Sequence, residues 1–69
     1  PGMKATDVQV GDWVEVMNPW GGDFAKVREI RNGTAIIGGA RIRVTIPPGA
    51  DDMECRKLDA DEVAALGLE

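Results

Sequence analysis

The dipeptide Asn32-Gly33 is the sequence feature that most constrains the fold of this chain. Both residues tolerate a positive φ, and a two-residue turn of this kind joins antiparallel strands in a β-hairpin. Apolar and polar residues alternate before it, from Phe24 to Arg31, and a short apolar segment follows it, from Thr34 to Ile37. Such alternation is typical of a strand with one buried face. The sequence therefore predicts a hairpin, and with it an antiparallel sheet.

Three further segments have the composition of strands: Trp13 to Met17, Ala40 to Ile46 and Met53 to Leu58. Turn-forming residues separate them, among them a Gly-Gly pair and a Pro-Pro-Gly run. In the second predicted strand, Val27 and Ile30 are three residues apart and cannot lie on one face of a regular strand. We expect a β-bulge near Arg28-Glu29 that returns both side chains to the core.

The pattern changes from strand to helix near the C-terminus. Asp59 begins the sequence Asp-Ala-Asp-Glu, which has the spacing of a capping box. Gly67 is placed to end the helix in the left-handed conformation. The sequence predicts a helix over residues 59–66. Because so short a helix does not persist alone in water, we expect it to dock on the sheet through Val63 and Leu66.

These elements predict an all-β fold, a small five-stranded antiparallel barrel with a short C-terminal helix. A chain of 69 residues protects its strand edges best by curling the sheet on itself. We expect a single domain over residues 3–69, with Pro1-Gly2 as the remnant of a cleaved tag. No apolar run approaches the length of a membrane span, and a single cysteine, Cys55, fits a reducing cytoplasm. The sequence therefore indicates a cytoplasmic protein without membrane association.

Residues Val8 to Ile30, VQVGDWVEVMNPWGGDFAKVREI, resemble the KOW motif, in which a hydrophobic-Gly-Asp turn leads into an alternating strand. A glycine-containing loop and a second strand follow in that motif. More broadly, the chain resembles SH3-like small barrels, which include Tudor and chromo-barrel domains and many bacterial and phage proteins. The resemblance implies a binding module that contacts RNA or proteins through the loops between its strands. Three aromatic residues are too few for the aromatic cage of a Tudor domain.

The sequence gives little support to a catalytic or metal-binding function. Histidine, the commonest general base near neutral pH, is absent. Cys55 lies between Glu54 and Arg56 and has no histidine to activate it, so we interpret it as a small buried side chain. The acidic clusters lack the spacing of a calcium-binding loop. We expect a non-catalytic protein that uses neither metal nor cofactor.

Basic residues gather in the middle of an acidic chain. Residues 24–46 carry a formal charge of +4, whereas the whole chain carries −4 with a pI near 4.6. Arg41 and Arg43 lie two apart in a predicted strand and share its outer face, and Lys26 and Arg28 do the same. Such pairs can neutralise phosphates, or they can pair with acidic side chains on neighbouring strands. The low pI argues against nucleic acid.

Trp20 lies among turn formers in the segment MNPWGGDF, where a large apolar side chain needs an explanation. Trp13 and Met17 alternate with valines and are predicted on the outer face of the first strand. Either Trp20 folds back as a lid on Trp13, or the three side chains form an apolar patch for a partner. The C-terminal helix is another candidate to cover Trp13. We expect the lid.

Three functions fit these patterns. The first is a non-catalytic adaptor that binds a protein or peptide. The second is a KOW-type RNA-binding domain. The third is a structural subunit that forms homo-oligomers through the apolar patch or an open sheet edge. The candidate residues for a protein or peptide partner are Trp13, Met17, Trp20, Arg41 and Arg43, and those for nucleic acid are Lys26, Arg28, Arg41 and Arg43.

Overall fold

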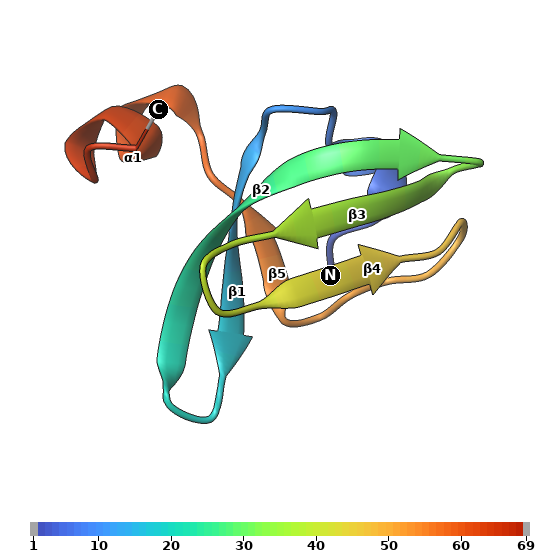
Figure 1. Ribbon diagram of the computed structural model, residues 1–69, viewed down its shortest axis with the longest axis horizontal. Helices are drawn as coiled ribbons and strands as arrows, with labels where there is room; N and C mark the ends of the chain where they lie inside the picture. The colour runs from blue at the N-terminus through green and yellow to red at the C-terminus, as the bar shows by residue number, and fades with distance from the viewer. Residues whose placement is uncertain (1, 69) are drawn as a thin grey trace.

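Five antiparallel strands form one sheet in the order β4-β3-β2-β1-β5 (Figure 1). The structure is a computed structural model and describes residues 2–68. The all-β class with a short C-terminal helix is therefore confirmed. The elements are a 3₁₀ turn η1 (Ala5–Asp7), β1 (Trp13–Asn18), β2 (Gly21–Arg31), β3 (Thr34–Gly38), β4 (Arg43–Ile46), β5 (Cys55–Lys57) and α1 (Ala60–Ala65).

The predicted hairpin at Asn32-Gly33 joins β2 to β3. Asn32 and Gly33 have φ angles of 50° and 79°, the left-handed values that this turn requires. The predicted bulge is also present, because the β2–β3 register shifts between Val27 and Glu29. The bulge returns Ile30 to the inner face of the sheet, but Ile30 stays 39% exposed near the hairpin end. Its expected burial in the core is wrong.

The β1–β2 connection is shorter than the sequence suggested. β1 ends at Asn18 and β2 begins at Gly21, so the turn contains only Pro19 and Trp20. The glycine-rich residues that follow pair with β1 instead of forming a loop up to Phe24. Gly21 has a φ of 126°, and proline suits the first turn position because its φ is already fixed. The segment is a tight hairpin tip.

The last two strands are also shorter than predicted. β4 begins at Arg43, so Arg41 lies in the β3–β4 loop and not in a strand. β5 covers three residues of the predicted segment Met53 to Leu58. The apolar face of the predicted fourth strand is confirmed, because Ile42 and Val44 pack against the buried cluster that contains Ile46.

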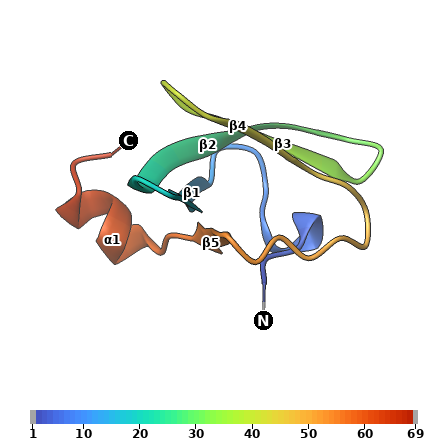
Figure 2. The same ribbon diagram turned by 90° about the horizontal axis from the view of Figure 1, so that it is seen from below.

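The core lies between the two arms of the bent sheet. Figure 2 shows β3 and β4 on one side and β5 with the N-terminal segment on the other. Met3, Ala5 and Val8 belong to the buried cluster, and Met3 bridges Asp52, a contribution that the sequence analysis missed. β4 and β5 do not pair with each other among residues 2–68, so the sheet bends without the closure of a complete barrel. The buried strand residues are Val14, Val16, Ala25, Val27, Ala35, Ile37, Ile46 and Cys55.

Helix α1 has the predicted caps but packs loosely. The Asp59 carboxylate accepts a hydrogen bond from the Glu62 backbone N–H at 2.8 Å, and Gly67 has a φ of 72°. None of the residues of α1 is buried. Val63 is half-buried, whereas Leu66 is 48% exposed, so its expected role as a docking contact is wrong. Within the described part of the chain, no helix is long or apolar enough to cross a bilayer.

Candidate functional site

Trp20 stands at the tip of the β1–β2 hairpin and is 92% exposed. The expected lid on Trp13 is therefore wrong. The Trp20 indole points outward, and a hydrogen bond to the Asn18 side chain fixes the backbone of the turn that carries it. The side-chain oxygen of Asn18 accepts a hydrogen bond from the Trp20 backbone N–H at 2.9 Å, an arrangement that mimics a backbone turn. A large apolar side chain is thus presented to solvent on a short, hydrogen-bonded tip.

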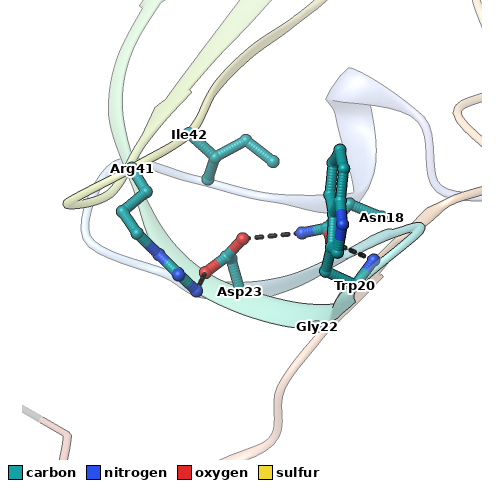
Figure 3. A pocket seen from close by; sticks show the side chains of 6 residues that line it. All are labelled: Asn18, Trp20, Gly22, Asp23, Arg41 and Ile42. Carbon is teal, nitrogen blue, oxygen red and sulfur yellow. Dashed lines mark hydrogen bonds and ion pairs between the residues drawn. The ribbon is translucent and has the colours of Figure 1, made fainter.

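The β3–β4 loop lies opposite this tip and is tied to it through Asp23. One carboxylate oxygen of Asp23 accepts from the Asn18 amide at 2.7 Å, and the other accepts from Arg41 at 2.5 Å (Figure 3). Asp23 is largely shielded, with its side chain 17% exposed, whereas that of Arg41 is 78% exposed. The ion pair joins two connections that are far apart in sequence.

Together these groups form an open pocket of about 330 Å³. Figure 3 shows the Trp20 indole on one side of it and Ile42 with Arg41 on the other, above Asp23. Because Asp23 neutralises Arg41, the ion pair adds no net charge to the pocket. Two walls are apolar, and the free guanidinium N–H groups of Arg41 remain available as donors. The lining residues are Asn18, Trp20, Gly22, Asp23, Arg41 and Ile42.

The structure divides one of the two predicted pairs of basic residues, Arg41 and Arg43, between different cavities. Arg41 contacts Asp23, whereas Arg43 lines a different hollow on the outer side of the sheet, together with Arg28. Lys26 and Arg28 both lie on the outer face of β2, and the Lys26 ammonium is 5.1 Å from the centre of the Trp13 ring. Of the four basic side chains expected on one surface, Arg41 therefore lies apart, in the Trp20 pocket. The pair Arg41 and Arg43 predicted from strand alternation is divided because Arg41 precedes β4.

Trp13 is half-buried and lines a groove of about 650 Å³ that it shares with α1. The helix is linked to the sheet by Arg56, which pairs with Glu15 of β1 at 3.1 Å and with Glu62 of α1 at 2.9 Å. This shared groove agrees with the alternative to the Trp20 lid, in which the C-terminal helix lies beside Trp13. Its apolar lining is Trp13, Leu58, Ala60, Val63, Ala64 and Leu68.

The three side chains of the predicted apolar patch do not line one common pocket. Met17 lies on the outer face with Trp13 and is 48% exposed, but it does not line the Trp20 pocket. The surface predicted for a partner is thus divided among the pocket of Trp20 and Arg41, the groove of Trp13 and the hollow of Arg43. Asp23 is the residue that sequence reasoning missed, because its partner in the ion pair is eighteen positions away.

Cys55 is buried, and its thiol has low reactivity. Burial, together with the nearby carboxylate of Asp52, raises the pKa of the Cys55 thiol to about 12. A thiol with so high a pKa forms almost no thiolate near neutral pH and is a poor nucleophile. Among residues 2–68, no three acidic or cysteine side chains gather in a group that could hold a metal ion.

Comparison with protein-family models finds no match, and comparisons with curated proteins and with solved structures also find none.

Proposed function

We propose that this chain is a non-catalytic binding module that takes up a protein or peptide segment in the pocket between Trp20 and Arg41. The observation that carries the proposal is the exposure of Trp20 on a turn that two hydrogen bonds hold in place. Tryptophan and arginine are the residues most enriched among those that dominate binding energy at interfaces. A site whose turn is already fixed loses less entropy when it binds.

The charge of the site and the fold support a peptide over RNA. The basic residues expected for RNA are divided among separate places, and Arg41 and Lys26 are engaged by Asp23 and Trp13. A polyanion would also meet the net negative charge of the chain. The single bent sheet and its strand order support the resemblance to SH3-like small barrels, which implies binding through the loops.

A random peptide library displayed on phage and selected against the folded chain tests the proposal. We expect enriched peptides that bind the parent and lose at least about 30-fold in affinity for Trp20→Ala, the effect of removing a dominant interface residue. Met53→Ala is the matched control, because Met53 is 73% exposed and lies outside the pocket. Failure to enrich any peptide, or equal binding to Trp20→Ala, would contradict the proposal.

A further inference from the structure

Arg28 and Arg43 are the two guanidinium groups that have no acidic partner among residues 2–68. Lys26 is likewise outside an ion pair, but its ammonium lies over the Trp13 ring. In an acidic chain, two unpaired arginines at one place are a local excess of positive charge. The basic residues that do form ion pairs are Lys4, Arg31, Arg41, Arg56 and Lys57.

These two arginines line one hollow of about 380 Å³ over β3. Arg43 is the cross-strand partner of Gly38, and Arg28 donates from Nε to the Gly38 carbonyl at 3.3 Å. Gly38 has no side chain, and the Arg28 side chain lies beside it, 3.6 Å from where a Cβ would stand. Glu29 also lines the hollow, but it is paired with Arg31 and leaves the two charges uncompensated. The other guanidinium donors of Arg28 and Arg43 remain free for an anion.

The hollow adjoins the Trp20 pocket across the β3–β4 loop. Ile42 lines both cavities, with Arg41 in the pocket and Arg43 in the hollow. Only Ile42 lies between these arginines in the sequence, so their Cα atoms are at most about 7 Å apart. An extended ligand advances about 3.3 Å per residue, so two or three residues of it span the same distance.

We propose that the segment bound by this chain carries an aspartate or glutamate within three residues of the apolar side chain that enters the Trp20 pocket. The acidic side chain contacts Arg28 and Arg43, and the apolar side chain packs on the indole. This inference rests on the proposed function. It deepens it, because the apolar pocket and the basic hollow together define the chemistry of the ligand.

An acidic peptide suits the hollow better than a nucleic acid. Residues outside 24–46 carry a formal charge of −8, which repels a long polyanion more strongly than it repels one or two carboxylates. The hollow is also partly apolar, because Ile36 and Ile42 line it beside the arginines. A side-chain carboxylate with its short apolar stem matches both features.

The test begins with the peptides selected by phage display, scored for acidic residues near the apolar anchor. Binding of one selected peptide and its Glu→Gln or Asp→Asn counterpart is then measured against the parent and Arg28→Gln/Arg43→Gln. We expect the double variant to weaken the acidic peptide about fivefold to tenfold at low salt and to leave the neutral peptide unchanged. Lys4→Gln/Lys57→Gln removes the same charge elsewhere and should change neither.

The outcomes separate this inference from the proposed function. Peptides that need Trp20 but bind Arg28→Gln/Arg43→Gln with the same affinity as the parent would overturn the inference and leave the proposed function standing. Equal binding to Trp20→Ala would overturn the function itself. A single-stranded RNA oligonucleotide that competes for Arg28 and Arg43, where the acidic peptide does not, would overturn the inference in favour of nucleic acid.

Discussion

Replacing Trp20 by alanine should leave the stability of the fold almost unchanged. The residue is 92% exposed, and a fully enclosed tryptophan buries up to about 250 Å², so folding removes only about 20 Å² of its surface from water. At about 25 cal/mol per Å², this burial contributes about 0.5 kcal/mol to the free energy of unfolding. A tryptophan that served as a lid on the core would instead contribute about 3–5 kcal/mol.

Urea unfolding followed by far-ultraviolet circular dichroism distinguishes these values, because that signal comes mainly from the peptide backbone and each variant supplies its own folded and unfolded baselines. Ile37→Val is the control for sensitivity. Ile37 is 0% exposed, and its loss of one methyl group should cost about 1 kcal/mol. A loss above about 2 kcal/mol for Trp20→Ala would refute the reasoning, since it exceeds what the exposed side chain can contribute.

Three further changes test other parts of the structure. An added Cβ at Gly39 would lie 2.8 Å from a backbone oxygen, so Gly39→Ala should lower the free energy of unfolding by about 1–3 kcal/mol. At Gly38 the nearest atom to an added Cβ is 3.6 Å away, so Gly38→Ala should cost less. Thermal unfolding of both variants measures the difference. Burial raises the pKa of Cys55 from 9.0 to about 12. The contribution of the protonated thiol to the free energy of unfolding is therefore fully present below pH 9. It is lost as the pH rises toward 12, and the parent should lose about 1.4 kcal/mol per pH unit relative to Cys55→Ala in urea titrations. Asp59→Ala removes a helix cap and should raise amide exchange across α1 by the equivalent of about 1 kcal/mol, unlike Asp61→Ala; equal exchange in both variants would show that the cap does not hold the helix.

The local features of the fold were predictable because they depend on neighbouring residues. Asn32-Gly33 defines its own turn through the φ values that both residues tolerate. The three-residue spacing of Val27 and Ile30 predicts the bulge, since two apolar side chains cannot share a face at that spacing. The capping box at Asp59 follows from hydrogen bonds within four residues. Each is a property of a short stretch of chain.

The site was only partly predictable because it depends on contacts between distant segments. Alternation does not say where a side chain at a turn points, so the exposure of Trp20 could not be read from its neighbours. Arg41 was assigned to a strand, whereas it lies in the adjoining loop and forms an ion pair with Asp23 of β2. The contribution of Met3 to the core likewise depends on its β-bridge to Asp52, a residue far away in the sequence.

Acrylamide quenching of Trp20 fluorescence in a Trp13→Phe background, with and without a saturating selected peptide, tests the central claim most directly. The indole is 92% exposed in the free chain, so its quenching should approach that of N-acetyltryptophanamide. It should fall several-fold when the peptide covers the pocket. Weak quenching in the free chain, or unchanged quenching at saturation, would contradict the claim that Trp20 is an exposed anchor for a ligand.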